Sequence, residues 1–376
     1  MSHFFTGKSR FSRDQFVKWC RDKRQREDFT PQLLSRLTKT KNNFKPPVIW
    51  LGTNTCSGDH LSLLNSLDPG YQKMIEDLID FRFSYLLMAA EGERATRCLY
   101  QVMDEAPGQY ILIVEGSIAT RSNGLYSVMG RKKNGQPLTS LQTVQELGAK
   151  AKYVVAAGTC ASFGGPYSAA PNPSQSKPVQ AILERPVINV PGCPIHPDWL
   201  MGTLAHLVWY GIPELDAYHR PTMFYGQTIH ELCERRPYFE EGVFSKQLGE
   251  PWCMYKLGCK GPVTYADCPR RQWSGDPISW PVKANTPCIG CTSPEFPDDD
   301  MPFFEHLPDF QWPGIRLSAK ELGRAAGLIS ALGIGTHLAG NIVTGRLSRN
   351  LRKGFKDQKH GTLMRLQGLL KNKRKG

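Results

Sequence analysis

Several features that would place this chain in a familiar class are missing from its sequence. Its 376 residues contain no long uninterrupted apolar run and no internal repeat, so neither a set of membrane spans nor a solenoid is expected. Ser12–Lys18 has only the outline of a twin-arginine export motif, because Asp14 stands in place of the second arginine and no apolar stretch follows. We therefore predict a cytoplasmic location without a functional export signal, and we leave membrane association open.

The cysteines do not suit a disulfide framework either. There are eleven of them, an odd number, in a chain far longer than small disulfide-stapled domains. Several cluster with a histidine in the second half of the sequence, which in a protein of this size indicates metal binding.

Positive charge is concentrated at the two ends of the chain, whose formal net charge is +13. Residues 1–46 hold twelve Lys and Arg against four Asp and Glu, and residues 315–376 hold fourteen against two, so the middle is mildly acidic. Basic ends suit an acidic partner, an anionic membrane surface or nucleic acid. Solvated tails that keep the protein in solution are an equal alternative.

Short apolar runs alternate with helical patterns over the first two hundred residues. Strands are predicted at residues 47–51, 81–88, 110–114, 152–157 and 186–190, and helices at residues 62–78, 94–103, 138–148 and 198–210. This alternation predicts an α/β domain with a doubly wound, flavodoxin-like parallel sheet.

Composition divides the chain into four predicted parts. They are a basic N-terminal extension (1–45) with a short helix near residues 29–37, the α/β domain (46–211), a loop-rich segment (212–314) and a basic helical C-terminal extension (315–376). The loop-rich segment is rich in Pro, Gly, Cys and aromatic residues and would be marginally stable alone. Metal clusters would supply the missing cross-links.

Three cysteines directly follow predicted strands. Cys56, Cys160 and Cys193 occupy such positions, and Glu115 closes another strand. Because ligands bind outside the carboxyl ends of parallel strands, the predicted fold brings these thiols to one edge of the sheet. Core packing does not explain this placement, since loop cysteines at strand ends bury little surface.

Seven further candidate ligands lie in the loop-rich segment. They are His230, Cys233, Cys253, Cys259, Cys268, Cys288 and Cys291. The first four could build either a tetrahedral zinc site or an iron–sulfur cubane with one imidazole ligand. Composition alone does not decide between the two metals.

Five motifs containing these residues follow one another along residues 47–308. They are Trp50-Leu51 with Cys56-Ser57-Gly58-Asp59, Gly158-Thr159-Cys160, Pro191-Gly192-Cys193-Pro194, His230-x-x-Cys233 and Pro287-Cys288-Ile289-Gly290-Cys291. In sequence and order they resemble the small subunits of nickel–iron hydrogenases.

The resemblance implies three iron–sulfur clusters and their ligands. Cys56, Asp59, Cys160 and Cys193 match a proximal 4Fe–4S cluster; His230, Cys233, Cys253 and Cys259 match a distal 4Fe–4S cluster; Cys268, Cys288 and Cys291 match a medial 3Fe–4S cluster. Pro281 stands where some relatives have a fourth medial cysteine, which agrees with a three-iron cluster. Cys20 and Cys98 match no ligand position.

Asp59 departs from the family pattern, which has Cys-x-x-Cys at this point. We interpret Asp59 as a carboxylate ligand, a harder donor than thiolate that holds its corner less firmly and alters the cluster potential. Alternatively, Asp59 caps the following helix. The fourth ligand position of the proximal cluster is then filled by His60, by water or by nothing, and the cluster is 3Fe–4S. The replacement resembles the actinobacterial-type, oxygen-insensitive subgroup.

The resemblance implies an electron-transfer subunit. Hydrogen is split at a nickel–iron site in a large-subunit partner, and electrons pass through the proximal, medial and distal clusters to an external acceptor. We expect a large, rather apolar interface with that subunit and a higher-order assembly of heterodimers, without nucleic acid. A hydrogen-sensing regulatory subunit and a zinc-stapled binding protein are the alternatives.

The sequence also suggests contacts for some residues outside the ligand sets. Glu115 is expected to make a hydrogen bond at an interface rather than relay protons, and Trp273 and Phe296 to pack on the medial cluster or merely on neighbouring loops. Residues 325–343 are short and interrupted for a span, so we expect this helix to pack on a partner or lie at a membrane surface, with a true span as the less favoured alternative. His337 within it is interpreted as an ordinary helix residue rather than a haem ligand.

Overall fold

The computed structural model describes residues 45–66, 70–132, 134–273, 278–307, 310–312, 315–317 and 319–344. The chain divides into two compact units, Met1–Leu307 and Pro308–Gly376. The helix predicted near residues 29–37 lies outside the described residues. The α/β sheet and the loop-rich segment belong to one unit, and the boundary between residues 211 and 212 stays a prediction.

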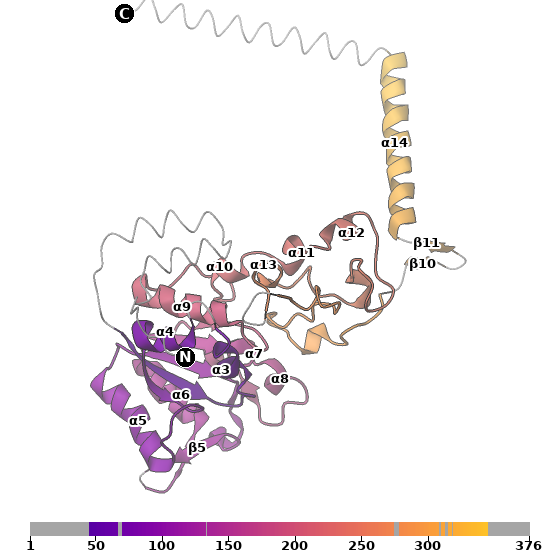
Figure 1. The fold of residues 1–376 in the computed structure, drawn as a ribbon. Coiled ribbons are helices and arrows are strands. Elements are labelled where there is room, and N and C mark those ends of the chain that lie inside the picture. The colour runs from indigo at the N-terminus through magenta and orange to yellow at the C-terminus, as the bar shows by residue number, and fades with distance from the viewer. Residues whose placement is uncertain are drawn as a thin grey trace, which may run out of the picture. The chain divides into compact units, whose positions relative to one another are not determined.

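A five-stranded parallel sheet forms the centre of the first unit (Figure 1). Its strands are β1 (Pro47–Gly52), β2 (Asp80–Ser84), β3 (Ile111–Glu115), β7 (Tyr153–Ala157) and β9 (Ile188–Val190), in the spatial order β2-β1-β3-β7-β9. This order is the flavodoxin-like one and confirms the predicted doubly wound sheet. Its direction of winding reverses between β1 and β3, where such folds bind their ligands.

Helices cover both faces of the sheet, which explains why its strands are almost wholly apolar. Alternate strand residues point to opposite faces. One face packs on α9 (Pro197–Trp209) through a buried cluster that includes Val48, Trp50, Ile111, Ile113, Trp199 and Leu204. The other packs on α5 (Gly92–Glu105) and α6 (Ser140–Lys150) through Ile49, Leu51, Leu112, Val114, Leu99 and Val144.

Three predicted helices are confirmed as α5, α6 and α9, but the helix predicted over residues 62–78 is wrong. The structure has α3 (Gly58–Leu63), then α4 (Tyr71–Lys73), which runs into a π-helical turn at Met74–Leu78. Pro69 lies between the two segments in the sequence, where its ring and its missing N–H disfavour a continuous helix. Gly70, which follows, is extended.

The remaining elements of the first unit are short. Near the sheet they are β4 (Ile118–Ala119) paired with β8 (Ser176–Lys177), β5 (Val128–Arg131) paired with β6 (Pro137–Thr139), α7 (Gly158–Phe163), α8 (Gly165–Ser168) and 3-10 turns at Arg121–Gly124 and Val179–Ala181. In the loop-rich segment they are α10 (Thr222–Tyr225), α11 (Ile229–Leu232), α12 (Arg236–Glu240) and α13 (Cys268–Arg271), with 3-10 turns at Tyr255–Leu257 and Asp298–Asp300. Their shortness agrees with the predicted scarcity of regular structure there.

The described part of the second unit contains an antiparallel hairpin and one long helix. The hairpin joins β10 (Phe310–Trp312) to β11 (Ile315–Leu317), and it was not predicted. The helix α14 (Ala319–Val343) includes the apolar stretch 325–343. Among the described residues, no helix combines the length and the apolar character that a membrane crossing requires.

Candidate functional site

The three thiols that follow strands meet at the carboxyl edge of the sheet. Cys56 follows β1, Cys160 lies in α7 directly after β7, and Cys193 follows β9. Burial, followed by the charges of Cys193, Asp59 and Cys56, raises the pKa of Cys160 to about 12. Iron bound here would replace the thiol protons and neutralise the thiolate charges, which burial and mutual repulsion make unfavourable.

Asp59 joins these thiols from the first turn of α3. Its side chain is only 6% exposed, and its Oδ1 accepts a hydrogen bond from the backbone N–H of Ile195 at 2.7 Å. Ser57 is the N-cap residue of α3, and the Asp59 side chain accepts from Ile195 rather than from the helix, so the alternative in which Asp59 caps it is wrong. Burial, and then the charge of Glu115, raises the pKa of the Asp59 carboxyl.

The absence of a side chain at Gly158 leaves space for the Asp59 carboxylate. A Cβ built on Gly158 would lie 2.0 Å from Asp59 Oδ2, far closer than atoms can approach. The backbone of Gly158 also has φ +82°, in the left-handed region that glycine adopts most easily. Both requirements explain a glycine two residues before Cys160.

Glu115 anchors the loop that carries the first thiol. Its carboxylate is completely buried and accepts hydrogen bonds from Trp50 Nε1 at 2.9 Å, Tyr85 OH at 3.0 Å, Thr55 Oγ1 at 2.9 Å and the Asp59 N–H at 3.2 Å. Because the carboxylate is completely buried and each of its oxygens already accepts two hydrogen bonds, it is not available to a partner, and the expected interface hydrogen bond is wrong. The sequence did not reveal that the side chains of Trp50, Thr55 and Tyr85 would surround this carboxylate as donors.

His60, the other candidate for the fourth corner, is directed into the protein. Its ring stacks on that of Trp50 with 4.2 Å between centroids, and it is completely buried. Neither ring nitrogen hydrogen-bonds to the described part of the chain.

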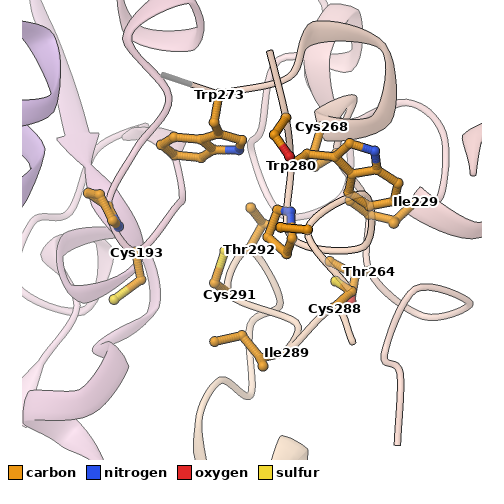
Figure 2. A pocket seen from close by; sticks show the side chains of 15 residues that line it. Cys193, Ile229, Thr264, Cys268, Trp273, Trp280, Cys288, Ile289, Cys291 and Thr292 are labelled. Atoms are coloured by element: carbon orange, nitrogen blue, oxygen red, sulfur yellow. The ribbon is translucent and has the colours of Figure 1, made fainter. Parts of the chain in front are cut away.

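A cavity of about 370 Å³ lies among the predicted medial ligands. Cys268, Cys288 and Cys291 line it, together with Trp273, Pro281 and Cys193 (Figure 2). In this view Cys291 lies between Cys193 and Cys288. Burial raises the pKa of all three medial thiols. A cavity lined mainly by thiol sulfurs and apolar side chains fits a thiolate-bound iron–sulfur cluster.

Trp273 lines this cavity, whereas Phe296 does not. Phe296 stacks instead on Phe303, with ring centroids 5.7 Å apart, so the expectation that it packs on the medial site is wrong. Sequence could not separate these two aromatics, because both lie in loops of similar composition.

Thr159 connects the proximal and medial groups. Its buried hydroxyl donates a hydrogen bond to the carbonyl oxygen of Cys291 and accepts one from the N–H of Gly192 at 2.9 Å. One side chain thus joins three cysteine-bearing loops. This function was not apparent from the sequence, where Thr159 is simply the middle residue of a Gly-Thr-Cys motif.

The four predicted distal ligands line a second, smaller cavity. They are His230, Cys233, Cys253 and Cys259. A capping box formed by Thr228 and Glu231 fixes the start of α11 and so places His230 in its first turn. His230 is half-buried, and its ring contacts Phe239 edge-on, with 4.5 Å between ring centroids. Burial raises the pKa of Cys233 to about 11.

Arg235 is a buried cation at this second cavity that the sequence did not indicate. Its guanidinium donates to the carbonyl oxygens of Glu250 at 2.9 Å and Trp252 at 3.0 Å, and it also hydrogen-bonds Asn285. Its charge lowers the pKa of Cys253 and of Cys259, partly offsetting their burial. Arg235 therefore both positions the loop before Cys253 and stabilises the thiolates.

The medial group is in electrostatic contact with both of the others. The charge of Cys291 raises the pKa of Cys193 on the proximal side, and the charge of Cys259 raises the pKa of Cys288 on the distal side. Because Cys193 also lines the medial cavity and the backbone of Cys288 hydrogen-bonds the Cys259 thiol, the three groups form a continuous series. Within the described residues, no three His, Cys, Asp or Glu side chains converge as the ligands of one metal ion do.

The two cysteines without a predicted ligand function lie apart from these groups. Cys98 is half-buried on α5 and packs against the core on that face of the sheet. Cys20 lies outside the described residues.

Family models match most of the first unit. Residues 225–304 match the model of the C-terminal part of the NiFe/NiFeSe hydrogenase small subunit, and residues 56–207 match that of the NADH ubiquinone oxidoreductase 20 Kd subunit. The chain is 36% identical to the periplasmic [NiFe] hydrogenase small subunit of Solidesulfovibrio fructosivorans, over 78% of this chain and 93% of that protein. It is 33% identical to the uptake hydrogenase small subunit of Azotobacter vinelandii, over 91% and 95%.

Solved structures give the same result. The NiFeSe hydrogenase of Desulfomicrobium baculatum matches with a TM-score of 0.67 and 38% identity, over 70% of this chain and all of that one. The actinobacterial-type NiFe-hydrogenase of Ralstonia eutropha H16 matches with a TM-score of 0.68 and 28% identity, over 82% of this chain and 94% of that one.

Proposed function

Because this chain belongs to the family of nickel–iron hydrogenase small subunits, we propose that it holds three iron–sulfur clusters in series and conducts electrons from the large subunit to an external acceptor. The observation that carries the proposal is the continuity of the three thiol groups. The medial cavity is lined by Cys193 of the proximal group, and Cys288 on its other side is coupled to Cys259 of the distal group.

The ligand sets of the proposal are those implied by the sequence. Cys56, Asp59, Cys160 and Cys193 would hold the proximal 4Fe–4S cluster, Cys268, Cys288 and Cys291 the medial 3Fe–4S cluster, and His230, Cys233, Cys253 and Cys259 the distal 4Fe–4S cluster. Bound clusters of these kinds supply one-electron redox chemistry. Two observations support the place of Asp59 in the first set: its buried carboxylate lies against Gly158, and its charge acts on the thiols of Cys160 and Cys193.

The chain's own residues would adjust these sites in different ways. Glu115 and Thr159 fix the loops that carry the thiols, which keeps the sites at constant separation. At the distal end, neutral His230 in place of a thiolate and the cation of Arg235 both reduce the negative charge around the site. Less negative surroundings favour the reduced state, so electrons are drawn toward the distal end.

The proximal end lies at the surface, where the large subunit would bind. Cys56 and Cys193 are both exposed. Leu61, Leu64 and Tyr167, whose side chains are also exposed, come from α3, its C-cap and α8 at the same edge. Exposed apolar side chains around a redox site are typical of a protein interface.

Several finer statements belong to the same proposal and rest on sequence alone. These are a cytoplasmic location, predicted from the altered Arg-Asp pair at residues 13–14, a higher-order assembly of heterodimers, and contact of residues 325–343 with a partner or a membrane surface. Cell fractionation and the mass of the purified complex test them directly.

Iron content and electron paramagnetic resonance (EPR) test the cluster assignment. The complex with the large subunit is purified anaerobically, and the iron of the small subunit is obtained after subtracting that of the nickel–iron site. About eleven irons with one three-iron signal support the proposal with Asp59 as a ligand. About ten irons with two three-iron signals would remove Asp59 from the ligand set, and zinc without iron would contradict the proposal entirely.

A further inference from the structure

Asp300 is a buried carboxylate that none of the predicted ligand sets uses. It ends the 3-10 turn Asp298–Asp300 and is 6% exposed, whereas its neighbours Asp298 and Asp299 are exposed. Its Oδ2 atom has no hydrogen-bond partner among the described residues. A buried carboxylate oxygen without a donor is costly, so its position calls for a physical reason.

The carboxylate lies directly against the loop that joins two medial thiols. A Cβ built on Gly290 would lie 2.4 Å from Asp300 Oδ2 and 2.8 Å from Cγ. Gly290 lies in the short loop between Cys288 and Cys291, and Cys288, Ile289 and Cys291 line the medial cavity. The carboxylate therefore packs against the backbone of a loop whose other residues line the cavity.

The charge of Asp300 acts on the medial thiols. It raises the pKa of Cys291, which is the effect of a nearby negative charge on a thiol. Lys260 is the cation that acts on Asp300, and its backbone N–H donates to the carbonyl oxygen of Cys288 at 2.8 Å. Burial raises the pKa of Asp300 to about 6, which leaves it ionised at pH 8.

We propose that the negative charge of the buried Asp300 carboxylate lowers the reduction potential of the medial cluster. This inference rests on the proposed function, since it requires a cluster bound by Cys268, Cys288 and Cys291. Adding an electron to the cluster adds negative charge beside a fixed, poorly solvated anion, which is unfavourable. The carboxylate thus makes the medial site harder to reduce than its thiolates alone would.

The test is a redox titration of the medial EPR signal at pH 8 in the anaerobically purified complex. Asp300→Asn keeps the shape and removes the charge, and we expect the reduced-to-oxidised ratio at a fixed potential to rise about tenfold, equivalent to about 59 mV for one electron. Asp299→Asn, an exposed neighbour on the same turn, is the matched control and should leave the ratio unchanged. Asp300→Glu, which retains the charge, should stay near wild type.

The outcomes separate this inference from the proposed function. An unchanged potential in Asp300→Asn, with the three-iron signal and the iron content intact, would overturn the inference alone. If Asp300→Asn does not load iron, the neutral Asp300→Ser is titrated in its place. Loss of the medial cluster in both Asp300→Asn and Asp300→Ser would also overturn the inference, because Asp300 would then be required for the cluster to assemble. Absence of iron from the wild-type complex would instead contradict the proposed function.

Discussion

At the scale of single residues, the proximal edge depends on very close packing between a glycine and a carboxylate. Gly158 meets both a steric and a conformational requirement, and only the steric one concerns Asp59. The two can be separated, because Gly135 has nearly the same backbone conformation, φ +81° against +82°, and a Cβ added there would meet nothing within 4 Å. A substitution at each position therefore isolates the contact with Asp59.

We predict that Gly158→Ala lowers the iron content of the complex, because its methyl group displaces the Asp59 carboxylate from the proximal thiols. Gly135→Ala has the same backbone strain, about 1–2 kcal/mol, and should retain all its iron. Iron per complex and thermal unfolding are measured for both variants. Equal iron content in the two variants would show that the contact between Gly158 and Asp59 does not support a cluster.

At the scale of elements, α13 is joined to α9 by a buried ion-pair network. Arg271 of α13 donates to Asp198 of α9 at 2.9 Å and to Asp267 at 2.6 Å, and the guanidinium is almost completely buried. This network connects the loop-rich segment, which has few regular elements, to the helix layer of the sheet. It also fixes the helix that begins at Cys268.

Arg271→Met should destabilise the complex by about 3–5 kcal/mol, because two carboxylates would remain buried without their cation. Arg82→Met is the matched control: its pair with Asp80 is 49% and 38% exposed and should contribute about 0–1 kcal/mol. Denaturant unfolding of the complex gives both values. A loss at Arg271 no larger than that at Arg82 would be incompatible with a structural function for this network.

The start of α9 introduces a dependence on pH. His196 is its N-cap: Nδ1 accepts from the Asp198 N–H at 3.1 Å, and Nε2 lies 2.7 Å from the carbonyl oxygen of Gln272, which fixes the neutral ring as donor there. Burial lowers the pKa of His196 to about 4, and the charge of Asp198 opposes this shift.

Since the folded pKa lies below the ordinary value of 6.5, the unfolded chain binds the proton first as the pH falls. Stability is therefore unaffected above pH 6.5 and is lost progressively between pH 6.5 and 4, by about 1 kcal/mol at pH 5.5. Unfolding of the complex at pH 7.5 and 5.5 measures this loss. His196→Gln should show a smaller difference between the two pH values, and an equal difference would exclude His196 as its source.

The sequence predicted the regular elements better than the loops. The five strands were recognisable because burial on both faces makes them continuous apolar runs, and their alternation with helices determined the sheet type. The break between α3 and α4 was missed because the apolar spacing continues across Pro69. The hairpin at Phe310–Leu317 was missed although Pro313-Gly314 is a turn dipeptide, because each paired strand is only three residues long.

The candidate site was predictable where chemistry is carried by rare residue types. Cysteines and His230 have few other functions at such spacings, so their grouping could be anticipated, and the predicted medial and distal residues each line one cavity. Glu115, Thr159, Arg235 and Asp300 are common residues whose importance lies in burial and in contacts with residues distant in sequence. No local pattern contains that information.

At the scale of the whole first unit, the three groups form a path with two accessible ends. The exposed Cys56 and Cys193 mark the proximal end, and half-buried His230 marks the distal end. The buried medial thiols lie between them. A series of this kind has the form expected of an electron-transfer subunit, whose two partners bind at different places.

The central claim is that electrons from hydrogen enter this chain and pass through the medial site. The most direct test is the EPR spectrum of the oxidised complex, frozen before and after exposure to hydrogen without any mediator. We predict that hydrogen abolishes the medial three-iron signal and that Cys291→Ser, which weakens a medial ligand, alters that signal before hydrogen is added. A three-iron signal that persists under hydrogen but disappears with dithionite would contradict the account, because the cluster would then be present without being connected to the hydrogen-splitting site.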